Sequence, residues 1–367
     1  MKLLIHSIFL IFFGAGLAAQ DLADVKKAFE DEQFDQVIEL CSKEIKSSAG
    51  NAELLNWRGK ARNMLGDFYA AIGDFNFAIE TNPDFAEAYN NRGTSKFYLG
   101  DDENALLDFD QAITKQKDYA DAYGNRGFAK YNLEDLNGAY FDFSKSIELD
   151  PENADRYYNR GVIRAEMGEF MAAIDDYNKS IALDTSDAEV YNYRGVAKYG
   201  IGDFQGAVAD YNKSIEMDSL DAVKFDNRAM AKSALDDFEG AIEDLDASIN
   251  LYVDDPDTYN LRGVAKYNME KYEEAIEDYT LAISLDELEP LFYDNRASAK
   301  FDAQDFKGAM EDYSISIELY PNDPDSYYFR ALAKFEVGDN YDGCLDLNMA
   351  EQLGSVEASE ELKTRCK

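Results

Sequence analysis

The residues best suited to chemistry in this sequence are charged, and they recur at one spacing. An Arg returns every 34 residues in nine copies, a second basic residue follows it by four positions, and an Asp follows it by 16. One copy reads Arg160, Arg164 and Asp176. Residues four apart share one helix face, so we expect the Asp to pair with both cations, as a structural ladder that fixes register more than it adds stability. The alternative is a ladder that binds anions. The Arg column comprises Arg58, Arg92, Arg126, Arg160, Arg194, Arg228, Arg262, Arg296 and Arg330.

The sequence contains almost none of the residue patterns that catalysis uses. The one His of the chain is His6, so nothing after it offers an imidazole for a metal or for a Ser-His or Cys-His pair. No Gly-x-x-x-x-Gly-Lys phosphate loop occurs. We therefore expect a protein that is not an enzyme and that uses no cofactor and no metal.

The elements that carry the charged columns are paired helices. Each copy has two amphipathic helical patterns, split by a short turn such as Gly100-Asp101. In the first pattern a large apolar residue lies three positions before the Arg and a small residue directly follows it. The second pattern carries an apolar stripe such as Ala173, Tyr177 and Ile181. All six Pro residues fall between one second helix and the next first helix, where Pro is tolerated.

These columns closely resemble the tetratricopeptide repeat family, whose unit is a 34-residue helix-turn-helix. Residues 151–184 contain nearly the whole pattern, and the resemblance covers nine units over residues 52–357. It implies an all-α, right-handed α-solenoid whose concave groove is lined mainly by first helices. It also implies binding of a peptide or protein partner rather than catalysis.

The two ends depart from the repeat. Residues 20–51 keep an apolar second-helix pattern and are expected to form a degenerate N-terminal repeat. Residues 358–367 are expected to form a C-terminal capping helix. Residues 1–19 have a basic start at Lys2, an apolar run and small residues before Gln20, which is typical of a signal peptide. A membrane anchor is the alternative, but the glycines at positions 14 and 16 interrupt a run that needs about 20 apolar residues.

Two sets of first-helix residues are candidates for peptide contact in the groove that the resemblance implies. An Asn two positions before the Arg could bond a peptide backbone through both its donor and its acceptor. An aromatic residue five positions after the Arg could pack partner side chains, or could instead pack between neighbouring helices. The candidates are Asn56, Asn90, Asn192, Asn260, Phe97, Tyr131, Tyr199, Tyr267 and Phe301. Members of the family that clamp a C-terminal carboxylate use Lys and Arg where this chain has Glu53, Glu87 and Asp121, so that binding mode does not carry over.

The number of Cys residues limits the possible disulfide bonds, and the net charge limits the class of partner. Three Cys residues leave at least one thiol unpaired; Cys344 and Cys366 could form a bridge, or all three could be buried thiols. The net charge of −38 argues against nucleic acid as a partner and favours a basic one. The charged columns account for 18 of the 36 basic and 9 of the 74 acidic residues, which leaves 18 basic against 65 acidic residues elsewhere.

The sequence thus predicts an exported protein, periplasmic or secreted, whose mature chain does not insert into a membrane and which holds a protein or peptide partner. Two other functions remain open. One is a structural or assembly component of the cell envelope that self-associates. The other is a glycan- or cation-binding module.

Overall fold

The computed structural model describes residues 22–47 and 51–366. Within these ranges the chain forms helices and turns and no β-strand, which confirms the expected all-α class. The chain divides into two compact units between Thr185 and Ser186, and each unit is described by itself. The expected signal peptide at residues 1–19 lies outside the described residues.

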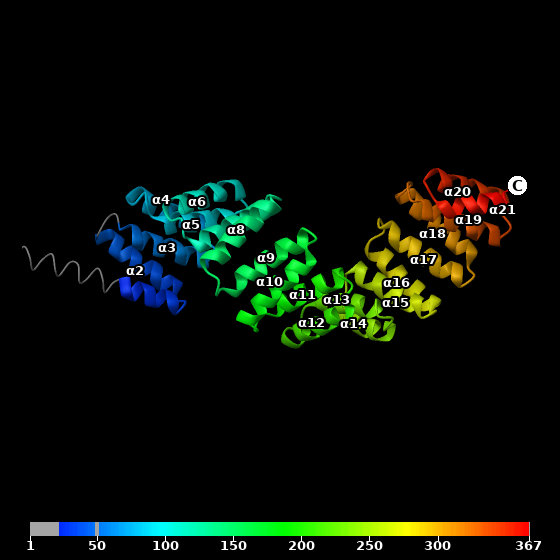
Figure 1. Ribbon diagram of the computed structural model, residues 1–367, viewed down its shortest axis with the longest axis horizontal. Helices are drawn as coiled ribbons and strands as arrows, with labels where there is room; N and C mark the ends of the chain where they lie inside the picture. Colours follow the sequence, from blue (N-terminus) through cyan, green and yellow to red (C-terminus); the bar gives the residue numbers. More distant parts are fainter. Residues whose placement is uncertain (1–21, 48–50, 367) are drawn as a thin grey trace, which may run out of the picture. The chain divides into compact units, whose positions relative to one another are not determined.

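Each unit is a row of helices joined by short turns (Figure 1). In the first unit residues 22–30 are helical. They are followed by α2 (Phe34–Ser47), α3 (Ala52–Met64), α4 (Phe68–Thr81), α5 (Ala86–Tyr98), α6 (Asp102–Lys115), α7 (Ala120–Asn132), α8 (Leu136–Leu149), α9 (Ala154–Glu166) and α10 (Phe170–Leu183). The second unit contains α11 (Ala188–Gly200), α12 (Phe204–Met217), α13 (Ala222–Ser233), α14 (Phe238–Leu251), α15 (Pro256–Asn268), α16 (Tyr272–Leu285), α17 (Pro290–Asp302), α18 (Phe306–Leu319), α19 (Pro324–Glu336), α20 (Asn340–Gln352) and α21 (Val356–Arg365).

Each odd-numbered helix from α3 to α19 forms a hairpin with the helix that follows it. We call these odd-numbered helices the first helices and their partners the second helices. The turn between them holds one residue in the left-handed conformation in every copy, and Gly takes this place in five of them. Gly100 has φ +76° there, whereas Glu134 adopts φ +62° at the same position. An Asp side chain often caps the second helix, as Asp135 does by accepting from the Gly138 N–H at 2.9 Å.

Inside the hairpin, a small residue on the first helix faces a large one on the second. A Cβ atom built on Gly161 would lie 2.7 Å from the Tyr177 ring, so the two helices meet at a distance that only Gly allows without a shift. Gly59, Gly93, Gly127, Gly195 and Gly263 meet the ring of their second helix in the same way. This close contact offsets the cost of about 1 kcal/mol for each Gly inside a helix.

The N-terminal hairpin, formed by residues 22–30 and α2, has its own apolar core against α3. Val25, Val37 and Cys41 are fully buried there beside Leu54. Burial raises the pKa of the Cys41 thiol to about 12, so this thiol is a packed apolar group and not a reactive one.

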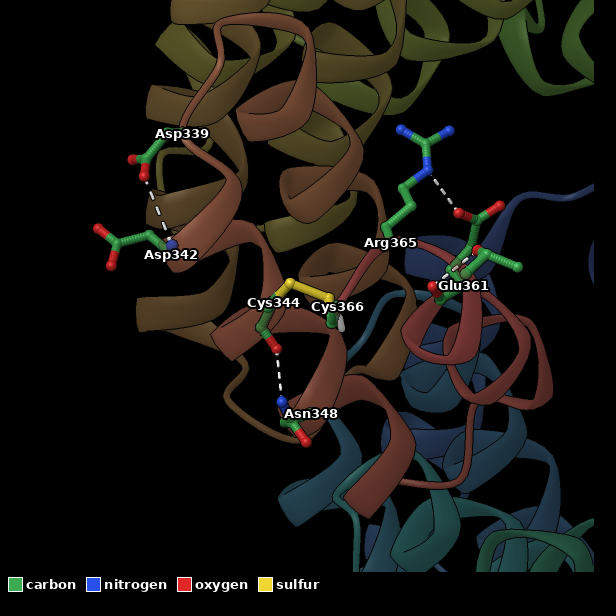
Figure 2. The surroundings of a disulfide bond; sticks show 8 residues. Asp339, Asp342, Cys344, Asn348, Glu361, Arg365 and Cys366 are labelled. Atoms are coloured by element: carbon green, nitrogen blue, oxygen red, sulfur yellow. Dashed lines mark hydrogen bonds and ion pairs between the residues drawn. A yellow bond between two sulfur atoms is a disulfide. The ribbon is translucent and has the colours of Figure 1, made fainter.

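The C-terminal end is closed by the single helix α21, which packs on α20. This helix begins at Val356, two residues before the expected boundary, because the Ser355 hydroxyl caps it by accepting from the Ala358 N–H at 3.2 Å. Cys344 on α20 and Cys366 just after α21 form a disulfide bond (Figure 2). Of the two possibilities left open by the sequence, the structure has the bridge.

None of the described helices is both long and apolar enough to cross a membrane.

Candidate functional site

The charged columns form ion pairs inside each of the nine hairpins from α3–α4 to α19–α20. In the hairpin of α9 and α10, Arg160 donates to Asp176 from Nε at 2.9 Å and from Nη2 at 2.6 Å. Arg164 donates to the same carboxylate from Nη1 at 2.8 Å. The Asp176 side chain is almost fully buried, and two cations satisfy it. The same Arg–Asp pair recurs in all nine hairpins.

The Arg of each hairpin is also tied to its surroundings by other contacts. Arg228 lies over the Phe225 ring at 5.5 Å and donates from Nη1 to the Asn212 Oδ1, 2.7 Å away on the preceding second helix. Arg262 reaches Asp246 on the preceding second helix at 2.6 Å in the same manner. The guanidinium group thus bridges two hairpins, which fits a structural role for the ladder better than anion binding.

The four Asn residues predicted to face a partner are instead buried between first helices. Asn56, Asn90, Asn192 and Asn260 are between 1 and 7 % exposed. Each accepts, through Oδ1, a hydrogen bond from an Asn 35 residues later, on the next first helix. The four bonds are Asn91 to Asn56 at 2.9 Å, Asn125 to Asn90 at 3.0 Å, Asn227 to Asn192 at 3.2 Å and Asn295 to Asn260 at 2.8 Å.

The predicted aromatic residues are half-buried and pack between hairpins. Tyr199 packs with Ala207 and Ala231, and its ring lies 5.2 Å from the Phe204 ring. Phe97, Tyr131, Tyr267 and Phe301 occupy equivalent clusters. The packing alternative therefore describes these rings better than free groove contact.

One column of buried residues, which includes two cations, was not predicted from the sequence. Four positions before the Arg, most repeats carry an apolar or small residue, but two carry a cation. Arg156 is 9 % exposed and binds Asp121 at 2.8 Å and Asp150 at 3.0 Å. Lys224 is fully buried and binds Glu189 and Asp218, each at 2.7 Å. A basic residue in a column of otherwise uncharged residues was the available signal.

The carboxylates around Lys224 have the spacing of a metal site. Glu189, Asp218 and Asp221 lie close enough together to share one cation. The Lys224 ammonium already occupies that position, so this cluster is an ion-pair network and offers little support for a cation-binding module.

A row of three adjoining cavities runs along the first helices of the first unit. Their volumes are about 490, 370 and 440 Å³. Thr94 on α5 lines all three, and Asn125 and Phe128 on α7 line two of them. We call this row the first-helix groove; each of the following residues borders at least two of its cavities: Lys60, Asn91, Thr94, Tyr98, Asn125 and Phe128. Of the predicted contact residues, Asn90 and Phe97 line it.

Models of known families match the repeated stretches. Three described as tetratricopeptide repeat match residues 120–153, 143–175 and 256–287, and one described as TPR repeat matches residues 162–202. The chain is a tetratricopeptide repeat protein. Repeat proteins of this family are generally non-catalytic scaffolds for protein–protein interaction.

Two solved structures agree with this fold, and a third is similar in sequence over about half of the chain. The APC/C hetero-tetramer Cut9–Hcn1 is 14 % identical with a TM-score of 0.50, covering 94 % of this repeat protein and 95 % of that chain. A tetratricopeptide repeat protein from Parabacteroides merdae is 18 % identical with a TM-score of 0.50, covering 68 % of this chain and 98 % of that chain. YrrB, described as a TPR protein with an unusual peptide-binding site, is 25 % identical with a TM-score of 0.45, covering 49 % of this chain and 93 % of that chain. Among curated proteins, none matches the sequence.

Proposed function

We propose that this repeat protein is a non-catalytic scaffold that holds an extended segment of a protein partner in the first-helix groove. The observation that carries the proposal is the row of three cavities that share Thr94 along the first helices. Concave, partly apolar surfaces with a few polar groups are where proteins bind ligands. Carboxamide, hydroxyl and aromatic groups all line this row, which suits a polypeptide with both backbone and side chains to accommodate.

Surface hydrophobicity alone does not select this face. Large apolar side chains are exposed on both kinds of helix: Phe128 on α7 is 38 % exposed, and Phe141 on α8 is 62 % exposed. The difference is that Phe128 borders two cavities, whereas Phe141 lines none of these three. The hollowed face is therefore the better candidate for the partner.

Charge favours a basic partner segment. The ion pairs inside the hairpins use half of the basic residues of the chain, so the rest of the surface is strongly acidic. Such a surface attracts a basic segment over distance and speeds its arrival, and this steering weakens as salt is added.

We also propose that the protein acts outside the cytoplasm. The motivation is the N-terminal sequence described above, together with the Cys344–Cys366 bond, since disulfides persist in oxidising compartments. Mass spectrometry of the protein recovered from its native cells tests this: loss of about the first 19 residues is expected, and an intact N-terminus would contradict export through a cleaved signal.

Assembly remains a second candidate because the second helices carry exposed apolar residues. Tyr69, Leu107 and Phe141 are each more than 60 % exposed on α4, α6 and α8. Light scattering over a concentration series tests this function. A mass that rises with concentration, and that falls back with Phe141→Ser, would favour assembly through the second helices.

Photo-crosslinking on the two faces of one hairpin tests the scaffold proposal. Benzoylphenylalanine is placed at Phe128 in one variant and at Phe141 in another, and each variant is exposed to the extract of its native compartment under light. Both sites are exposed aromatic residues, so the variants are matched in chemistry. We expect the Phe128 variant to capture a discrete protein that binds the purified chain again when isolated. Capture from Phe141 alone, or from neither, would contradict the groove as the binding face.

A further inference from the structure

Four of the eight pairs of successive first helices from α3 to α19 have the Asn–Asn bond, and of the four pairs without it one keeps the donor Asn. Two positions before the Arg, the third repeat carries Gly124 where four others carry the acceptor Asn. The residue that would donate to this position is Asn159, 35 residues later on α9. Among the described residues, no side chain forms a hydrogen bond with the Asn159 carboxamide, whereas Asn125 donates both to Asn90 at 3.0 Å and to Thr94 at 3.4 Å.

Gly124 leaves room where the missing side chain would lie. A Cβ atom built on it would meet the Ser146 Oγ at 3.5 Å and the Arg156 Nη1 at 3.8 Å, which is ordinary contact distance. The cavity of about 440 Å³ at the end of the first-helix groove opens at this point, and Gly124, Asn125 and Asn159 all line it. This space far exceeds the needs of a single water molecule.

The cations around the cavity are already paired, which limits its binding of anions, whereas the Asp155 carboxylate borders it without an ion pair to a described residue. Arg156 at its base binds Asp121 and Asp150, and Lys60 at its rim binds Glu87 at 3.2 Å. An anion would therefore have to displace an existing ion pair. Beside Gly124, two carboxamide side chains have groups open to a ligand. Neither the Asn159 carboxamide nor the Asn125 Oδ1 accepts a hydrogen bond from a described residue, and the Asn159 Nδ2 donates none to one.

The chain itself shows what such an Asn binds. In four other repeat pairs the donor Asn meets another carboxamide, at 2.8 to 3.2 Å. A carboxamide provides a carbonyl oxygen for the Asn159 N–H and an N–H for a nearby acceptor oxygen, so it satisfies both sides of the open position. An apolar side chain would leave the desolvated Asn159 amide without a hydrogen-bond partner, which disfavours its binding.

We infer that the Gly124 cavity takes the carboxamide of an Asn or Gln side chain of the bound polypeptide, in place of the side chain that the repeat lacks. The inference rests on the proposed function and makes it specific. It assigns Asn159 as the recognising residue, Gly124 as the residue that keeps the position open, and an Asn- or Gln-containing segment as the ligand. A sugar hydroxyl could use the same groups, and the experiment includes it as a competing outcome.

Peptide selection against the full chain tests the inference. Short randomised peptides displayed on phage are selected on the wild-type protein, and the enriched peptides are synthesised and titrated by fluorescence anisotropy. The informative variant is Gly124→Asn, which places a side chain at the open position and supplies Asn159 with an internal partner. Gly124→Ala is its matched control, since a Cβ atom fits there without a clash. Circular dichroism confirms that each variant is folded, and Asn159→Ala gives an independent loss of the recognising group.

The expected result is enrichment of Asn or Gln at one peptide position. Binding should weaken by at least about tenfold with Gly124→Asn, with Asn159→Ala, or when that peptide residue becomes Ala, and by less than about threefold with Gly124→Ala. Peptides that bind without an Asn or Gln, or that bind Gly124→Asn as well as the wild type, overturn the inference and leave the scaffold proposal intact. If no peptide binds the wild-type chain, the proposed function fails as well. If a chitin oligosaccharide binds and Gly124→Asn removes that binding, the cavity is a sugar site and the inference is wrong.

Discussion

Asn295 donates from Nδ2 to the Oδ1 of Asn260, 2.8 Å away, and so joins the first helices of two successive repeats in the second unit. Asn260 is 7 % exposed, and the bond is of a kind that three other repeat pairs share. The Asn residues that the sequence suggested as partner contacts therefore join neighbouring first helices in the structure.

This relationship predicts the effect of Asn260→Ala. The change leaves the Asn295 amide without its acceptor in a partly buried position, so we expect the first helices α15 and α17 to open more easily, by about 1 to 3 kcal/mol. Native-state hydrogen exchange of the amides of these two helices measures this cost. Asn268→Ala, on the exposed end of α15, serves as the control. Equal exchange rates in the two variants would show that the Asn–Asn bond carries little free energy.

The ion-pair ladder predicts an unusual order of stabilities. Asp176→Ala leaves Arg160 and Arg164 without their shared carboxylate, and the expected loss is about 3 to 5 kcal/mol in the opening free energy of α10. Adding Arg160→Leu removes one of the two unpaired charges, so the double variant should be more stable than the single one. Hydrogen exchange on α9 and α10 checks the order. A double variant that is less stable than Asp176→Ala would contradict the interpretation.

The small residue of the first helix predicts opposite effects for two Gly→Ala changes. Gly161→Ala would force the Tyr177 ring to move, since the added carbon lies 2.7 Å from it. We expect a loss of about 1 to 2 kcal/mol, because Tyr313 tolerates Ala297 in its own hairpin and the ring can therefore shift. Gly73→Ala meets nothing within 4 Å and should gain up to about 1 kcal/mol from helix propensity. Thermal unfolding of the two variants side by side is the measurement, and a loss for both would refute the contact argument.

A buried carboxyl in the second unit predicts a dependence of stability on pH. Burial raises the pKa of Asp294 to about 6, although Ser316 and Ser326 lower it by donating hydrogen bonds. Because the pKa in the folded state exceeds the ordinary value of 3.8, ionisation of Asp294 opposes folding. The penalty is absent below pH 3.8, grows as the pH rises towards 6, and is complete above it.

Replacing this carboxyl by an amide should remove the penalty. Asp294→Asn should match the wild type near pH 4 and exceed it by about 2 to 3 kcal/mol near pH 8. Urea unfolding at both pH values, monitored through spectroscopic signals of residues in α17 and α18, gives the free energies of unfolding to be compared. Asp254→Asn, on an exposed turn, is the control. A stability gain of the same size at both pH values would show that the charge of Asp294 is not the cause.

Much of the fold follows from the sequence because nine copies reinforce one pattern. A single apolar stripe is ambiguous, but nine copies at one period define both helices and their turn. The ion pairs were predictable for the same reason. Arg160 and Asp176 recur as a fixed pair 16 residues apart, and a buried carboxylate needs such a partner.

The position of the Asn side chains could not be predicted from one repeat alone. Whether Asn90 faces a partner or the next repeat depends on how closely the neighbouring first helices α5 and α7 approach, and a pattern within one repeat does not give that distance. The 35-residue separation of Asn90 and Asn125 was the available sign of pairing. The cavity at Gly124 was harder still to foresee, since it arises from a side chain that is missing.

The aromatic residues show the same limit. Tyr199 and Phe204 are five residues apart in sequence and meet across the hairpin turn, so their contact removes ring surface that the helix pattern alone assigns to the outside. The column containing Arg156 and Lys224 was missed because it mixes apolar, hydroxyl and basic residues and so shows no single pattern.

The most direct test of the central claim, that a polypeptide lies in the first-helix groove, is calorimetric titration of the captured partner against Phe128→Ala and Phe141→Ala. Both changes remove an exposed Phe from one hairpin, and circular dichroism controls for folding. We predict that Phe128→Ala weakens binding by at least about tenfold and that Phe141→Ala changes it by less than about twofold. Loss of binding with Phe141→Ala and not with Phe128→Ala would place the partner on the second helices and contradict the account.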